Sequence, residues 1–199
     1  METNDKVLTP EESLQLISQT IAGLKENYKK DNHYFILWGW IVSLASISQF
    51  AMLRVLISMK AYDHLNLYSW LIWGILIATG ISLQNYYKFR NGQRTVKSHL
   101  GKFFTILWQC SGAAIVLAVI ISVNLHVYPN PFVLIIAGLA TLISGRLIRF
   151  KPLIYGGIAF FAFAIAASFF NNEYQLAICS AAFVTGYLIP GYILKYSKG

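Results

Sequence analysis

Six long apolar stretches, separated by short polar segments, dominate the sequence. They run over residues 34–53, 65–87, 103–125, 131–148, 152–172 and 174–194. Each is close to the roughly 20 residues that a helix needs to cross a hydrocarbon core of about 30 Å. Arg146 is the one Asp, Glu, Lys or Arg within them, and it lies one turn from the end of the fourth. The pattern therefore predicts six transmembrane helices.

The segment before the first apolar stretch has a different pattern. Thr9, Pro10 and Glu12 form a capping-box signature, which predicts a helix start, and the helix is expected to run to about Lys30. Five apolar residues spaced 3, 4, 3 and 4 apart form one narrow stripe, here called the N-terminal seam: Leu14, Ile17, Ile21, Leu24 and Tyr28. Because acidic and basic residues nearly balance, this amphipathic helix is expected to pack on protein rather than on lipid: its own loops, a second copy or another chain.

Composition supports a membrane protein. Of the 199 residues, 56% are hydrophobic and 12% are charged, about half the charged fraction of soluble domains. Two cysteines are too few for a disulfide scaffold. A cleavable signal peptide is not expected, because about 33 mostly polar residues precede the first apolar run. We expect an all-α integral membrane helical bundle with a cytoplasmic N-terminal segment, residues 1–32, and a six-span domain, residues 33–199.

The positive charges predict how the bundle is oriented. Fourteen of the sixteen Lys and Arg lie on one side: before the first stretch, between the second and third, after the sixth, or between the fourth and fifth together with Arg146 at the end of the fourth. Only Arg54 and Lys60 lie on the other side. Because basic residues are retained in the cytoplasm, both termini are expected there, and the net charge of +8 is mostly a topology signal rather than a sign of nucleic-acid binding.

Polar residues within the stretches leave two interpretations of function open. No carboxylate lies at membrane depth, which argues against ion-coupled transport. Gln49, Gln109 and Pro190, in the first, third and sixth stretches, could line the path of a channel or facilitator for a small solute. Polar residues in spans more often bond between helices, and Pro190 more often makes a structural kink by freeing the carbonyl of Gly186.

Catalytic and metal-binding signatures are missing from the sequence. It has no serine elbow and no phosphate-binding loop, and the spans hold serines but no histidine base, so an enzyme is not expected and no cofactor is implied. Asp63, His64, His126 and Glu173, from the three outer loops, would form a zinc-type site only if those loops converged. Their spacing matches no known ligand motif, so no metal site is predicted.

Small residues and aromatic residues predict where helices pack and where the membrane surfaces lie. Small residues at contact spacing predict close helix pairs. They are Gly112, Ala113 and Ala114 in the third stretch, Ala137, Gly138 and Thr141 in the fourth, and Ala162, Ala164, Ala166 and Ser168 in the fifth. Trp38, Phe104 and Trp108 near the inner ends, and Tyr128 and Tyr174 near the outer ends, are expected to anchor at the interfaces.

Four short motifs occur along the chain: Glu11-Glu12-Ser13-Leu14, Phe35 to Trp40, Phe150 to Ile154 followed by Gly156-Gly157, and Ile189-Pro190-Gly191-Tyr192. With these motifs the chain resembles a family of uncharacterised small bacterial inner-membrane proteins with six spans and an N-terminal amphipathic helix. It implies a multi-pass inner-membrane location but no activity. We expect a non-enzymatic interaction or regulatory protein, with membrane lipids and either a cytoplasmic protein or a second copy as partners, and a small-solute channel or facilitator as the alternative.

Overall fold

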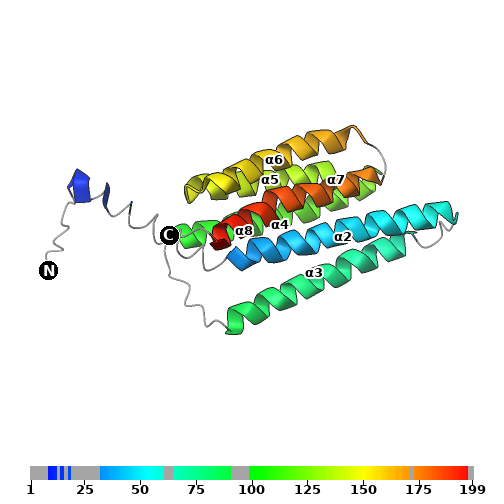
Figure 1. Ribbon diagram of the computed structural model, residues 1–199, viewed down its shortest axis with the longest axis horizontal. Helices are drawn as coiled ribbons and strands as arrows, with labels where there is room; N and C mark the ends of the chain where they lie inside the picture. The colour runs from blue at the N-terminus through cyan, green and yellow to red at the C-terminus, as the bar shows by residue number, and fades with distance from the viewer. Residues whose placement is uncertain are drawn as a thin grey trace.

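The computed structural model describes residues 9–12, 14–15, 18, 32–60, 65–90, 99–170 and 173–196, and the described part is helical, without strands. The helices are α2 (Asn32–Ser58), α3 (Leu65–Arg90), α4 (His99–Asn124), α5 (Asn130–Leu147), α6 (Lys151–Ser168), and a composite last helix made of α7 (Tyr174–Phe183), the π-helical η1 (Val184–Leu188) and α8 (Ile189–Tyr196). They lie side by side along one axis, and α2 begins at the same end of the bundle where α8 ends (Figure 1).

All six predicted spans are present as helices long and apolar enough to cross a membrane. The bounds differ from the prediction by up to five residues, most at the end of the first helix, the start of the third and the end of the fifth. The first helix continues past Arg54 to Ser58, because the Arg54 guanidinium lies near the helix end and pairs with Glu173. The fifth ends at Ser168 rather than residue 172, since the next two N–H groups, of Phe169 and Phe170, bond to carbonyls only three residues back.

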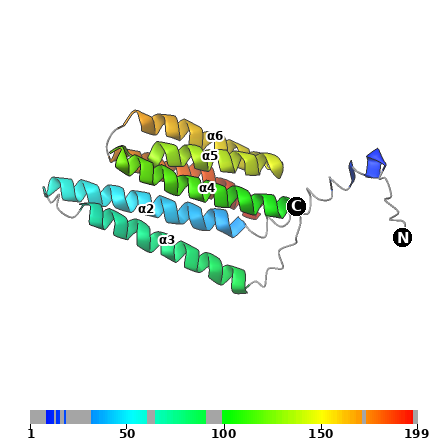
Figure 2. The ribbon, with the colours of Figure 1, turned by 180° about the vertical axis from the view of Figure 1, so that it is seen from behind.

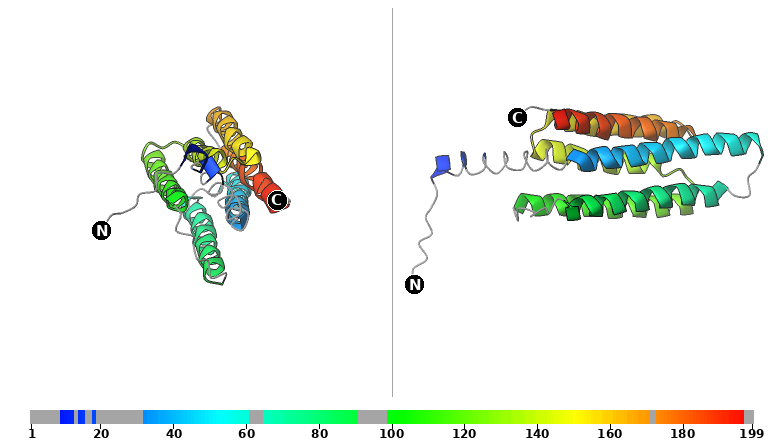
Figure 3. Two further views of the ribbon diagram at one scale, coloured as in Figure 1. Left: turned by 90° about the vertical axis from the view of Figure 1, so that its left-hand side faces the viewer. Right: turned by 60° about the horizontal axis from the view of Figure 1, so that its bottom comes forward.

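The bundle has a packed core and two peripheral helices. The core consists of α2, α5, α6 and the composite last helix, whereas α3 packs mainly on α2 and α4 mainly on α5 (Figure 2). Viewed along the bundle, α3 and α4 lie at its edge (Figure 3). Half of the last span is buried inside the protein, but only 6% of the α3 span and 6% of the α4 span are. The two peripheral helices therefore leave most of their apolar surface uncovered.

Glycines bring α5 and α6 into backbone contact. A Cβ added to Gly157 would lie 2.8 Å from the backbone nitrogen of Leu142, and one added to Gly145 would lie 2.7 Å from that of Ile154. The connection between the helices is equally tight. Arg149 adopts a left-handed conformation (φ 51°), and the Phe150 N–H donates to the Gly145 carbonyl at 2.9 Å, which closes the end of α5 as a Schellman motif.

The small-residue prediction is confirmed in α5 and only partly elsewhere. Ala137, Gly138 and Thr141 are buried. In α6 the buried small residues are Gly156, Gly157, Ala164 and Ala167, whereas Ala162 and Ser168 are exposed. In α4, Gly112 and Ala113 are exposed, so the predicted close pair does not form among the described residues. The anchoring prediction is wrong for Phe104, which is buried, whereas Trp38 and Trp108 are partly buried and pack against the core.

Candidate functional site

The start of the N-terminal helix is the first candidate, and its predicted cap is present. The Thr9 N–H donates to Glu12 Oε2 at 2.9 Å, and the Glu12 N–H donates to Thr9 Oγ1 at 3.2 Å. These reciprocal bonds form the capping box. Leu14, the first residue of the N-terminal seam, is 67% exposed. The other seam residues, Ile17, Ile21, Leu24 and Tyr28, lie outside the described residues, so their docking stays a prediction.

Gln49, assigned above to a solute path, joins α2 to α3. The Trp73 indole N–H of α3 donates to Gln49 Oε1 at 2.7 Å, and the Trp38 indole N–H of α2 donates to Gln84 Oε1 of α3 at 3.0 Å. We call these two bonds the Trp–Gln clasps. The sequence contains a signal for them: Trp and Gln are eleven residues apart in both helices, close to three turns, so each pair lies on one helix face.

The other two residues of the predicted path have different surroundings. Gln109 is exposed on α4. Pro190 is buried in α8, where its ring lies beside Gly156 of α6. The place where the first, third and sixth spans meet is filled by the rings of Phe35, Trp108 and Tyr187, whose centroids are 5.8 to 6.2 Å apart. The structure therefore does not bring Gln49, Gln109 and Pro190 together around an opening.

The composite last helix changes its winding one turn before Pro190. Pro190 has no N–H to bond the Gly186 carbonyl, as predicted from the sequence, and the preceding residues Val184–Leu188 are π-helical. A Cβ on Gly156 would lie 2.7 Å from the Gly186 oxygen, so a Cα hydrogen of Gly156 points at this carbonyl. Gly186 in turn leaves room for the Phe160 ring, which a Cβ there would meet at 2.3 Å. The two glycines allow α6 and the last helix to touch at the freed carbonyl.

Several hydroxyl groups are buried in the core. Ser43 and Ser180 join α2 and α7, because each hydroxyl donates to the backbone carbonyl of the other residue, at 3.3 and 3.1 Å. The hydroxyl oxygens of Ser46 and Ser144 are also fully buried, but they have no hydrogen-bond partner among the described residues. Buried polar atoms without a hydrogen-bond partner are unusual in proteins.

An ion pair lies at the end of the bundle where α2 ends and α7 begins. Arg54 Nη1 lies 3.3 Å from Glu173 Oε1, and the guanidinium lies 5.3 Å from the centre of the Tyr174 ring. Burial, and secondarily the Glu173 carboxylate, raises the pKa of Tyr128 above its usual value. Within the described part of the chain no three His, Cys, Asp or Glu side chains gather, and Asp63 and His64 lie outside it. His126 is exposed, in a left-handed conformation that ends α4.

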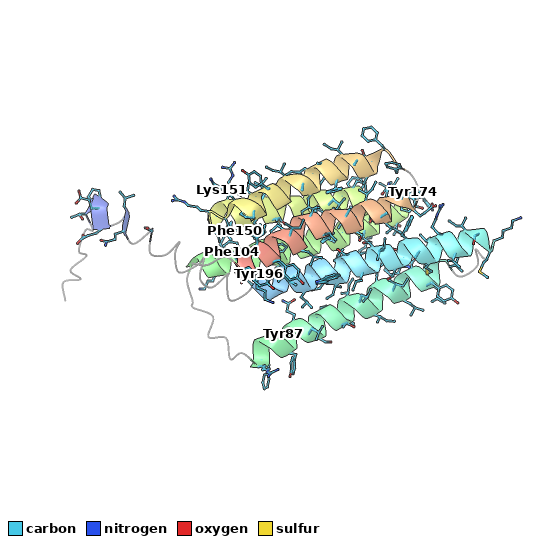
Figure 4. The ribbon with its side chains drawn as sticks, in the orientation of Figure 1. Tyr87, Phe104, Phe150, Lys151, Tyr174 and Tyr196 are labelled. Atoms are coloured by element: carbon cyan, nitrogen blue, oxygen red, sulfur yellow. The ribbon has the colours of Figure 1, made fainter. Side chains whose placement is uncertain are left out.

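The end of the bundle that holds the C-terminus combines aromatic and basic side chains. Tyr87, Phe104, Phe150 and Tyr196 lie at the end of the bundle where the C-terminus is, together with Lys151, whereas Tyr174 lies at the opposite end (Figure 4). The Lys195 ammonium lies 5.7 Å from the Tyr196 ring centre. This arrangement agrees with the charge asymmetry in the sequence, because α2, α4 and α6 begin at this end of the bundle and α3, α5 and α8 end there.

Two openings lie on the outside of the bundle. One, of about 310 Å³, lies between α4 and α5 and is lined by apolar residues such as Ala118, Ile121 and Phe132, with Ser122. The other, of about 600 Å³, is bounded by Tyr128, Phe161, Ile165 and Gln175. Both are bordered by α5, whereas Gln49, Gln109 and Pro190 border neither.

Comparison with known proteins assigns no relative: no family model, curated protein or solved structure matches the chain.

Proposed function

We propose that this chain is a multi-pass protein of the bacterial inner membrane, with both termini in the cytoplasm, that acts by interaction or regulation rather than catalysis. The six apolar helices support the membrane assignment. The orientation is supported by the helix ends next to the basic segments of the sequence, because the starts of α2, α4 and α6 and the ends of α3, α5 and α8 lie at one end of the bundle. In this proposal the bundle is a scaffold, and the N-terminal seam docks on a cytoplasmic protein or on a second copy.

One observation carries the proposal: the capped helix start and its exposed Leu14. The capping box defines where the N-terminal helix begins, and the first residue of the seam is uncovered in the chain by itself. A helix of about 20 residues with so narrow an apolar stripe is marginal alone in water. Packing on another protein surface would supply the missing stability, since burying one Ile or Leu contributes about 1.5–3 kcal/mol.

The double variant Ile17→Asp with Ile21→Asp tests this function. It should speed hydrogen exchange across residues 10–30 and abolish crosslinking of the helix to its partner, while the six spans stay folded. The control, Gln15→Asp with Gln19→Asp, adds the same charge on the opposite helix face and should change neither measurement. Exchange that is already fast in the wild type, with no crosslinked partner, would show that the seam docks on nothing.

The membrane assignment has its own test. The protein should stay in the membrane pellet after alkaline carbonate extraction. On a cysteine-free background, a maleimide that does not cross membranes should label Asn124→Cys from outside the cell and Lys151→Cys only after the membrane is opened; both positions are exposed at opposite ends of the bundle. Labelling of Lys151→Cys in intact cells would contradict the orientation.

A small-solute channel or facilitator is the second candidate. The unpartnered hydroxyls of Ser46 and Ser144 and the π-helical segment favour it, because π-helical turns occur often at functional sites. Reconstituted protein would then raise the permeability of liposomes to a small solute, and Ser144→Ala would change that flux. Unchanged permeability across a panel of ions and neutral solutes would leave the interaction function alone.

A further inference from the structure

Two openings flank the outward side of α5, where α4, α5 and α6 lie next to one another (Figure 2). The smaller, of about 310 Å³, lies between α4 and α5, and the larger, of about 600 Å³, is lined mainly by α5 and α6. Phe132 and Ile135 of α5 border both openings and are about half exposed. The openings are therefore neighbouring grooves separated by a ridge of two side chains. Both volumes lie within the roughly 300–1,000 Å³ that is typical of ligand sites.

The larger opening is apolar along its length and polar at one end. Phe161, Ile165 and Ser168 lie on one face of α6 and border it over seven residues, about 10 Å at 1.5 Å per residue. Its polar lining residues are Tyr128, Ser168 and Gln175. Tyr128 precedes α5, Ser168 ends α6 and Gln175 is near the start of α7, so all three lie at the same end of the bundle. The opening therefore suits an amphiphilic molecule.

Gln175 has an acceptor without a donor at this polar end. The residue is 3% exposed, and its Nε2–H group donates to the Phe170 carbonyl. Its Oε1 atom is buried and has no hydrogen-bond partner among the described residues. A buried acceptor in this state costs free energy, which a donor from a bound molecule would recover. The bound molecule should therefore carry a hydrogen-bond donor in its polar part.

The electrostatics at the polar end favour a donor with positive charge. Burial, and secondarily the Glu173 carboxylate, raises the pKa of Tyr128. The negative potential of Glu173 therefore reaches a residue that borders the opening, even though the carboxylate also pairs with Arg54. A hydrogen bond from a charged donor is roughly twice as strong as one between neutral groups. An ammonium group meets both requirements, because it donates and is positively charged.

We propose that the two openings bind one diacyl phospholipid with an ammonium headgroup, such as phosphatidylethanolamine, with one acyl chain in each groove and the ammonium group at Gln175. The inference rests on the membrane placement proposed above, which puts this end of the bundle at the outer surface. The ridge of Phe132 and Ile135 lies between the two chains. An acyl chain alone would leave Gln175 Oε1 without a donor, so the headgroup distinguishes this lipid from its neighbours in the bilayer.

Native mass spectrometry tests the headgroup, with protein from micelles that contain equal amounts of phosphatidylethanolamine and phosphatidylcholine with the same chains. The two lipids carry the same charges, but the choline nitrogen has no N–H. The wild type should retain one phosphatidylethanolamine per chain, with about tenfold preference. Equal retention would show ordinary boundary lipid, and a dimer without lipid would show that a second copy covers the openings. Either result overturns the proposal.

The number of chains is tested in the same way with the one-chain lyso form of phosphatidylethanolamine. It can fill only one groove, so it should be retained less than the diacyl form. Equal retention of the two forms would overturn the placement of a chain in each opening.

Two pairs of variants test the site itself. Gln175→Leu should abolish the tenfold preference, whereas Gln175→Glu, which breaks the same bond to Phe170 but keeps an acceptor oxygen, should preserve it. Ile165→Trp fills the larger groove and should lower retention of the lipid about tenfold. Its control is Ile158→Trp, because Ile158 is exposed on the same face of α6, two turns away, and borders neither opening.

The outcomes separate the site from the membrane assignment. A Gln175→Leu variant that keeps the preference, or equal effects of the two tryptophans, refutes the lipid site. Failure of the membrane assignment is seen separately, as release of the protein by carbonate.

Discussion

Gly157→Ala tests whether the backbone contact between α5 and α6 holds the core together. The added Cβ would lie 2.8 Å from the Leu142 nitrogen and 2.9 Å from its Cα, where unstrained contacts need roughly 3.5–4.0 Å. Because these are backbone atoms, no side chain can rotate away, and the helices must separate by roughly 0.5–1 Å. A gap of that size removes about a quarter to a half of the attraction energy of each atomic contact between α5 and α6. Overpacking of this kind costs about 1–3 kcal/mol.

Gly74→Ala is the control, because it makes the same change on α3 where a Cβ meets nothing within 4 Å. Alanine is favoured over glycine in a helix by up to about 1 kcal/mol, so this variant should be slightly more stable than the wild type. The same gain in helix stability applies at Gly157. The difference in free energy of unfolding between the two variants therefore gives the packing cost alone. Unfolding in mixed micelles with rising SDS fraction, followed by tryptophan fluorescence, measures both. If Gly157→Ala is as stable as Gly74→Ala, the contact argument is wrong.

Three further predictions address the periphery and the two ends of the bundle. Gln49→Leu should weaken the attachment of α3 by about 0.6–2 kcal/mol. A double-mutant cycle with Trp73→Phe should show that the two losses of stability are not additive. Additive losses would mean that the hydrogen bond between Trp73 and Gln49 contributes nothing. Arg149→Gly should stabilise the α5–α6 connection by about 1 kcal/mol, because the left-handed conformation at φ 51° is strained for every residue except glycine. The matched variant Arg149→Ala should give no gain in stability. A gain from alanine as large as that from glycine would contradict the reasoning. Beside Glu173, the folded protein keeps Tyr128 neutral at pH values above its usual pKa of 10.0. The contribution of this residue to stability is therefore complete below pH 10 and is lost as the pH rises above it. Glu173→Gln should lower the pKa of Tyr128 but leave the part of its rise that is due to burial. The pKa is measured from the difference in phenolate absorbance between each protein and its Tyr128→Phe variant. An unchanged pKa would show that Glu173 does not act on this tyrosine.

The elements of this protein are encoded locally, and sequence reasoning found them. Six apolar runs predicted six helices, because an apolar segment of this length satisfies its backbone hydrogen bonds only by forming a helix in a membrane. The Thr9 to Glu12 signature predicted a capping box, because both partners lie within one turn. The end of the bundle that carries the basic residues also follows from the sequence, since helices that alternate in direction place every second loop at the same end.

The neighbours of each helix were decided only by tertiary structure. In a soluble helix an apolar stripe shows which face is buried, but lipid is as apolar as a protein core, so lipid-facing and core-facing positions carry similar residues. Gln49 and Gln109 look alike in the sequence, yet one is bound by Trp73 and the other is exposed. Gly157 touches a backbone and Gly112 touches nothing. The packing of helices that are distant in sequence decides which glutamine is hydrogen-bonded and which glycine is needed. The residues next to each position in the sequence do not determine this packing.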